Sequence, residues 1–96
     1  MVIGVLQIEV HVDGSTSLKD KRRVLKSLKD KLHREHQVSV AETALHDDLA
    51  RGVLSIVLVS GDTKYAQSVL DKILARLERT PGFVLADHRT ELITGH

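Results

Sequence analysis

Alternating apolar and polar residues mark the first segment of this chain, residues 2–12. The apolar residues of its second half occupy every other position and are Leu6, Ile8, Val10 and Val12; Gln7, Glu9 and His11 lie between them. Successive side chains of a strand point to opposite faces, so a period of two is typical of a strand with one buried face. The turn-forming residues at positions 13–15 end this strand.

The next segment, residues 18–35, changes to a helical period. Its apolar stripe consists of Leu18, Leu25, Leu28 and Leu32, with Val24 at the margin. Ser17 is the expected N-cap of this helix, and Asp20 follows three residues later as in a capping box.

A second amphipathic helix is predicted from Asp62 or Thr63 to about Arg79, where Pro81 and Gly82 end it. Three further strands are expected at residues 37–44, 53–59 and 83–93. Residues 53–59 are apolar at nearly every position, which favours a central strand covered on both faces. Residues 45–52 are polar and are expected to form a loop.

The element order is therefore β-α-β-β-α-β within a single domain, residues 1–96. Right-handed crossovers then give a ferredoxin-like α+β sandwich, with two helices on one face of a four-stranded antiparallel sheet of order 4-1-3-2. The other face of the sheet stays uncovered and is partly apolar. Because exposed apolar patches mark interaction surfaces, we expect this face or the adjacent strand edge to bind a second copy in a homodimer.

Composition narrows the classes of function. The chain has 96 residues and no cysteine, which excludes disulfides, thiolate metal sites and cysteine nucleophiles. No apolar run approaches the length of a membrane span, and the N-terminus lacks the pattern of a signal peptide. We therefore expect a cytoplasmic protein with no membrane partner.

Charge is distributed unevenly although the net charge is only +1. Residues 19–35 contain eight basic and three acidic residues, which gives +5 and leaves −4 for the rest of the chain. Helical geometry places a row of basic residues on one solvent-facing side: Lys19, Arg22, Lys26, Lys29 and His33. We call these five residues the basic row. It suits an RNA backbone or a ribosomal component, although a solvated helix face has the same composition.

The start of the same helix is a second candidate site. Lys19 and Lys21 lie in its first turn, where free backbone N–H groups and two ammonium groups would hold an anion. Base stacking on the sheet, by contrast, has little support. The chain has two aromatic residues, Tyr65 and Phe83, and neither lies on strands 1 or 3 of the expected sheet.

Catalytic machinery is not recognisable. No nucleophile elbow or glycine-rich phosphate loop is present, so we expect no enzyme activity and no cofactor. The six histidines lack metal-binding spacings, which predicts no metal site. Glu42 ends a strand that is otherwise apolar or small. It would form an acid–base pair with Asp47 or Asp48, or an ion pair with a lysine or arginine at a dimer edge, and we favour the ion pair.

The sequence resembles one known family. The run SLKDKRRVLKSLKDKL at Ser17–Leu32, VSVAE at Val38–Glu42 and LVSGD at Leu58–Asp62 are similar to the YlxP-like family of short bacterial proteins. The resemblance spans nearly the whole chain and implies a ferredoxin-like fold, but no established activity. Genes of the family often lie beside translation-initiation and ribosome-maturation genes. Residues 45–52 depart from the family, since Asp48–Gly52 lacks the aromatic residue usual there.

Two functional hypotheses follow. The first is a non-catalytic, homodimeric binding module that engages RNA or a ribosomal component, with Arg22, Lys26 and Lys29 as main contacts. The second is a small-ligand sensor of ACT-like topology, whose site would be the loop Asp13–Ser17 between the first strand and the first helix.

Overall fold

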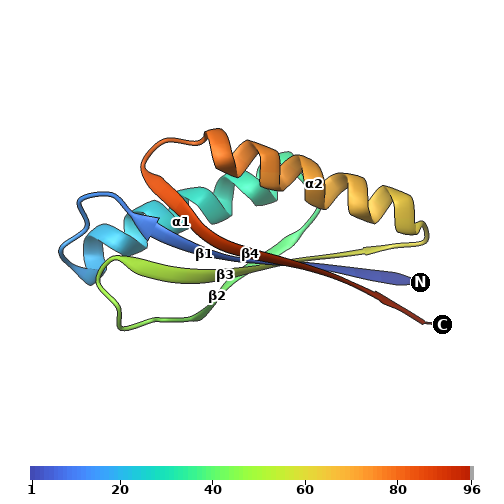
Figure 1. Ribbon diagram of the computed structural model, residues 1–96, viewed down its shortest axis with the longest axis horizontal. Helices are drawn as coiled ribbons and strands as arrows, with labels where there is room; N and C mark the ends of the chain where they lie inside the picture. The colour runs from blue at the N-terminus through green and yellow to red at the C-terminus, as the bar shows by residue number, and fades with distance from the viewer. Residues whose placement is uncertain (96) are drawn as a thin grey trace.

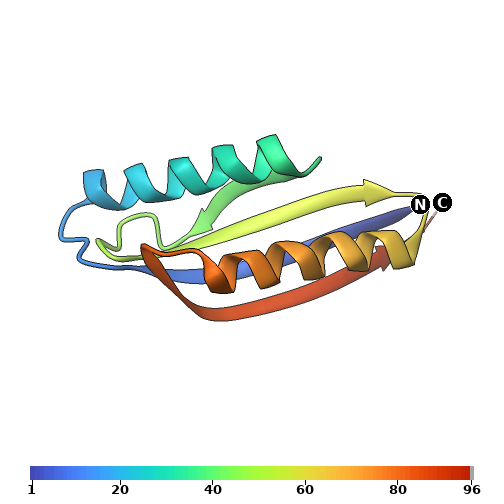
Figure 2. The ribbon, with the colours of Figure 1, turned by 90° about the horizontal axis from the view of Figure 1, so that it is seen from above.

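Two layers make up the part of the chain that the structure describes, residues 1–95 of a computed structural model. The elements are β1 (Val2–Val12), α1 (Leu18–Glu35), β2 (Ser39–Ala44), β3 (Arg51–Ser60), α2 (Thr63–Arg79) and β4 (Phe83–Thr94). Both helices lie on the same side of the sheet, and the other side is left uncovered (Figure 1). Seen from the helix side, α1 and α2 run antiparallel beside each other (Figure 2).

The strand order is β2-β3-β1-β4, and each neighbouring pair is antiparallel. This is the predicted 4-1-3-2 arrangement, so the ferredoxin-like fold is confirmed. β1 lies in the centre, with Leu6 opposite Ile56 of β3 and Thr90 of β4. β2 and β4 are the two edge strands.

The core lies between the sheet and the helices. Leu6, Ile8 and Val10 of β1 are fully buried, as the alternating pattern predicts. α1 packs on β2 and β3, whereas α2 packs mainly on β1 and β4. The helices contribute Leu25, Leu28, Leu32, Ala66, Leu70, Ile73 and Leu77 to this core. Full burial of a Leu or Ile side chain stabilises a fold by about 1.5–3 kcal/mol, so this layer contact holds the domain together.

Local capping confirms the helix starts. The Ser17 hydroxyl accepts a hydrogen bond from the backbone N–H of Asp20 at 3.1 Å. Asp62 caps α2 by accepting from the backbone N–H groups of Lys64 and Tyr65. Each bond satisfies an N–H group that the first helical turn leaves without an intrahelical partner.

Two strand starts differ from the sequence-based expectation. β2 starts at Ser39 rather than residue 37, and β3 starts at Arg51 rather than Val53. β3 begins earlier because β1 is long enough to pair with it there, with His11 opposite Arg51. Long-range pairing of this kind overrides the polar composition that predicted a loop.

The uncovered side of the sheet, which we call the open face, has two different ends. Near the termini it is apolar, since Ile3 lies between Val59 and Ile93 on the neighbouring strands. Further along β1 it is acidic, because Glu9 lies opposite Asp87. Neither helix, among the residues described, is long and apolar enough to cross a membrane.

Candidate nucleic-acid interface

Positive charge is concentrated in the helix layer. α1 and α2 together contain twelve lysines and arginines and five acidic residues, a formal charge of +7. The rest of the chain contains two basic and eight acidic residues, a formal charge of −6. The molecule therefore has a cationic helix side and an anionic remainder, a separation that the net charge of +1 conceals.

The basic row lies where the sequence predicted it. Lys19, Arg22, Lys26 and His33 are exposed, and Lys29 is half-buried. Lys26 Nζ lies 2.9 Å from Asp30 Oδ2, an exposed pair one helical turn apart. This pair lowers the pKa of Asp30, mainly through the hydrogen bond from Lys26. The other four members of the row have no ion-pair partner within residues 1–95, so their charges are available to an external anion.

Lys21 corrects the prediction of an anion site at the start of α1. Its side chain is 0% exposed, so no external anion reaches it. Its Nζ donates to three backbone oxygens, Leu45 O at 2.8 Å, His46 O at 3.2 Å and Arg51 O at 3.1 Å. The sequence could not show this, because the acceptors lie twenty-four or more residues away, on the loop after β2 and at the start of β3.

Glu42 supplies the counter-charge to Lys21. Its Oε2 lies 3.3 Å from Lys21 Nζ. The three ammonium hydrogens of Lys21 are all directed to backbone carbonyls, so Glu42 Oε2 contributes by charge and has no hydrogen bond of its own among the described residues. The ion-pair interpretation of Glu42 is therefore correct, but the partner belongs to the same chain rather than to a dimer edge.

The loop that follows Glu42 is held by Asp48 as well as by Lys21. Asp48 Oδ1 accepts from the backbone N–H of Arg51 at 2.7 Å and of Ala50 at 3.0 Å. These two bonds, together with the Arg51 guanidinium, lower the pKa of Asp48 to about 2. Its carboxylate is thus a structural acceptor. In residues 1–95 no group of three histidine or acidic side chains is arranged to hold a metal ion.

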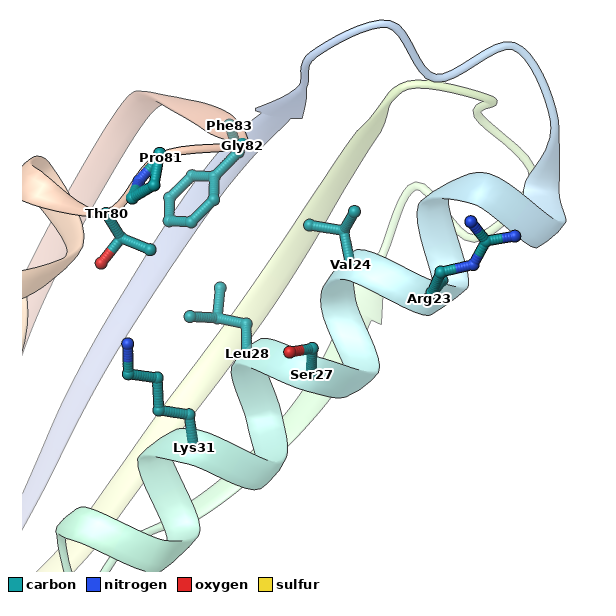
Figure 3. A pocket seen from close by; sticks show the side chains of 9 residues that line it. All are labelled: Arg23, Val24, Ser27, Leu28, Lys31, Thr80, Pro81, Gly82 and Phe83. Atoms are coloured by element: carbon teal, nitrogen blue, oxygen red, sulfur yellow. The ribbon is translucent and has the colours of Figure 1, made fainter.

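A groove between the two helices was missed by the sequence analysis. One hollow of 350 Å³ lies between α1 and the turn after α2, and Val24, Leu28 and Phe83 form its apolar lining. Figure 3 shows Arg23 and Lys31 at its rim. A second hollow of 580 Å³ adjoins it, and its basic residues are Lys31, Lys72, Arg76 and Arg79.

We call these two hollows the inter-helix groove. Arg76 is partly neutralised, because its guanidinium forms an ion pair with Glu35 of α1. The remaining groove cations are unpaired within the described chain. Periodicity within one helix could not identify this groove, because its residues come from two helices that only the fold brings together.

The loop proposed for a small ligand is used internally. Ser15 Oγ donates to Leu49 O at 2.6 Å, and Ser17 caps α1. Thr16 donates its backbone N–H to Asp20 Oδ2 at 3.4 Å. These contacts tie the loop to its own chain, and none of them favours the sensor hypothesis.

Comparison with known proteins decides the family. The model of the family described as "Protein of unknown function (DUF503)" matches residues 3–90. The chain belongs to the DUF503 family. Among curated proteins, this DUF503 chain is similar to "Uncharacterized protein YlxP" of Bacillus subtilis (strain 168), with 29% identity over 90 residues. The matched region covers 94% of this chain and 98% of that protein. The resemblance noted in the sequence is therefore confirmed.

The fold of this DUF503 chain also matches a solved structure. A de novo designed protein with a ferredoxin fold, determined by solution NMR, superposes with a TM-score of 0.57 at 19% identity. The match covers 99% of this chain and 88% of the designed protein. At this level of identity the likeness concerns the fold alone.

The segment 48–52, in which the family resemblance leads us to expect an aromatic residue, presents Leu49 at the surface of this DUF503 protein. The Leu49 side chain is 49% exposed. The loop backbone around it is fixed by Asp48 and Lys21, so the position is presented rigidly with an aliphatic side chain.

Proposed function

We propose that this protein is a non-catalytic RNA-binding module whose helix layer holds the phosphate backbone. The separation of charge is the observation that carries the proposal: +7 on the two helices against −6 elsewhere. RNA phosphates attract such a surface, and binding releases the counterions that surround the backbone. A segment of ribosomal RNA is one binding partner that would supply such phosphates.

Two sets of cations supply the contacts. The basic row lies on the flank of α1 that faces away from α2, and the inter-helix groove lies on the other flank. Unpaired charges on both flanks let one strand lie across α1 without breaking an internal ion pair. Contacts to phosphate position a strand but carry no sequence information, so we expect weak sequence preference.

The sheet is a poor alternative surface for RNA. The pair Glu9 and Asp87 on the open face repels phosphate. Neither aromatic side chain serves as a stacking platform there, because Phe83 is buried towards the helices and Tyr65 belongs to α2. These two facts favour binding through the helices over binding through the sheet.

We further propose that the protein performs no catalysis and acts as a homodimer. The carboxylates considered as a catalytic acid–base pair have structural partners instead. Glu42 forms an ion pair with Lys21, and Asp48 accepts hydrogen bonds from backbone N–H groups of its own loop. The open face and two edge strands, meanwhile, leave surface for a second copy within the described fold. A dimer doubles the number of cationic helices available to one RNA chain.

Binding of a short fluorescent single-stranded RNA, followed by anisotropy at several salt concentrations, tests the RNA proposal. Arg22→Glu alters the basic row and Lys31→Glu alters the inter-helix groove. Lys64→Glu is the matched control, because it makes the same charge change in the first turn of α2, away from both sets. We expect each test variant to weaken binding at least about tenfold and the control to weaken it much less.

Two kinds of result would contradict the proposed RNA interface. Binding that ignores salt, or that falls equally in all three variants, contradicts a localised phosphate interface. Absence of RNA binding by the unaltered protein at low salt overturns the proposal, because electrostatic affinity is greatest there.

A further inference from the structure

The outer edge of β4 is the longest unpaired strand edge of the molecule. β4 spans Phe83–Thr94 and pairs with β1 on one side only. Figure 2 shows it at the margin of the sheet, beyond α2. Six consecutive residues, 86–91, are exposed although they belong to a strand, so neither helix covers this part of the edge. Unpaired N–H and C=O groups of such an edge are a template for another strand.

A bulge divides β4 into two parts. Glu9 pairs with Asp87 whereas Val10 pairs with Leu85, so Ala86 is an extra residue. From Asp87 to Thr94 the register with β1 is regular. Thr90 is the midpoint of residues 87–93 within this segment, and a two-fold axis through Thr90 would pair these residues with themselves in antiparallel orientation.

Charges along the segment complement each other about that midpoint. Arg89 and Glu91 lie opposite Gln7 and Val5 of β1, so both are on the open face of the sheet. Within the described chain neither of them has an ion-pair partner. Antiparallel pairing centred on Thr90 would set each Arg89 directly opposite Glu91 of the second copy, on the same face, twice per dimer. Opposite charges in directly paired positions stabilise strand association.

We propose that two copies of the protein join edge to edge through residues 87–93 of β4, with Thr90 on the two-fold axis, to form one continuous eight-stranded sheet. On the helix side Thr90 pairs with its own symmetry mate, and His88 lies opposite Leu92 of the second copy. The inference rests on the homodimer proposed above but not on RNA binding.

Other modes of self-association fit the surface less well. A face-to-face dimer would bury the acidic pair Glu9 and Asp87, together with Gln7 and Arg89, without matched partners. An edge register centred on His88 would set two imidazoles against each other and would run through the bulge at Ala86. The register centred on Thr90 leaves Glu9 and Asp87 in solvent. It also keeps the two His88 imidazoles apart and avoids the bulge at Ala86.

The arrangement has a consequence for charge. α2 covers β1 and β4, so edge pairing through β4 places the two α2 helices next to each other on the same side of the joined sheet. The cations Lys72 and Arg79 of both copies would then lie on one continuous surface. A face-to-face dimer would instead direct the two helix layers in opposite directions.

Cysteine cross-linking tests the register, since the native chain contains no cysteine. Directly opposite residues of antiparallel strands have Cα atoms about 4.5–5.5 Å apart, which lies within disulfide range. A Thr90→Cys variant is therefore expected to form a covalent dimer under mild oxidation. Ser68→Cys, exposed on α2, is the matched control and should stay monomeric in non-reducing electrophoresis.

A charge-exchange series tests the ion pairs independently. Arg89→Glu places a carboxylate opposite Glu91 of the second copy, and we expect the dimer dissociation constant to rise at least about tenfold in sedimentation equilibrium. The double variant Arg89→Glu/Glu91→Arg exchanges the charges and should restore dimerisation. All substituted positions are exposed, and circular dichroism checks that each variant folds.

Each result decides between the proposals. A protein that stays monomeric at all concentrations overturns both the homodimer and the edge interface. A dimer that survives Arg89→Glu and gives no Thr90→Cys cross-link overturns the edge interface but retains the homodimer. Preferential cross-linking of a His88→Cys variant overturns the register centred on Thr90.

Discussion

Lys21 Nζ lies 3.3 Å from Glu42 Oε2 and joins the start of α1 to the end of β2. The same ammonium group holds the carbonyl of Leu45, whose φ of 60° lies in the left-handed region. That conformation is costly for a residue with a branched side chain, and it persists only where the surroundings fix it. One buried cation therefore fixes the loop between β2 and β3.

Removal of the Lys21 charge tests this role. In a Lys21→Met variant the apolar stem is retained, but Glu42 and three backbone carbonyls lose their partner. We expect the free energy of unfolding in urea to fall by about 3 kcal/mol, the lower part of the range for breaking a buried pair, because the Glu42 side chain is 20% exposed.

The control for Lys21 is Lys26→Met, which breaks the exposed pair with Asp30. It should cost less than about 0.5 kcal/mol. The double variant Lys21→Met/Glu42→Gln should lose less unfolding free energy than the two single variants lose together, because it removes both charges at once. Equal effects of Lys21→Met and Lys26→Met would contradict a structural role for Lys21.

Close packing of α1 on β3 predicts that Gly52 does not tolerate a side chain. A Cβ built at Gly52 would lie 2.9 Å from Leu25 Cδ1. A Gly52→Ala variant should therefore lose about 1–2 kcal/mol of stability through overpacking. Gly61→Ala is the control, since no atom lies within 4 Å of its Cβ. Thermal unfolding that shifts equally for both variants would refute the steric argument.

Asp48 predicts a pH dependence of stability. Hydrogen bonds from the backbone N–H groups of Arg51 and Ala50 hold its pKa at about 2, below the ordinary 3.8. A carboxyl group whose pKa is lower in the folded state stabilises the fold fully above its unfolded pKa and loses that contribution as the pH falls. The stabilisation should therefore decline from pH 3.8 towards pH 2.

Carbon-detected NMR titration measures the pKa of Asp48 directly, with an expected midpoint near 2. Urea unfolding should show that the stability difference between the native protein and an Asp48→Asn variant shrinks below pH 3.8. A titration midpoint at the ordinary value, or a difference independent of pH, would disprove the role of these hydrogen bonds.

Salt dependence gives a quantitative prediction for the proposed RNA interface. The slope of log K against log salt concentration reflects the number of phosphates neutralised. Lys31→Ala should reduce that slope by about one unit, because one cation leaves the interface. Lys64→Ala should leave the slope unchanged, and a reduction there as large as that for Lys31 would argue against localisation in the groove.

The element order could be predicted from the sequence because the spacing of apolar residues within each segment is that of a strand or of a helix. Alternation in residues 2–12 and the leucine stripe of α1 depend on neighbours a few residues away, and burial of one face is what selects them. The helix starts, at Ser17 and at Asp62 or Thr63, could be predicted for the same local reason, and the structure shows Ser17 and Asp62 as the caps. Strand order then followed from the handedness and shortness of the connections.

The candidate site residues show the same division between what the sequence predicts and what the fold decides. The exposure of four members of the basic row could be predicted from helical spacing alone, whereas Lys29 is half-buried. The burial of Lys21, the inter-helix groove and the pairing of Arg89 and Glu91 with uncharged neighbours depend on contacts between segments distant in sequence. Periodicity reports only which face of an element a residue occupies, whereas charge pairing, grooves and free edges depend on which other element lies beside it. That information exists only once the chain has folded.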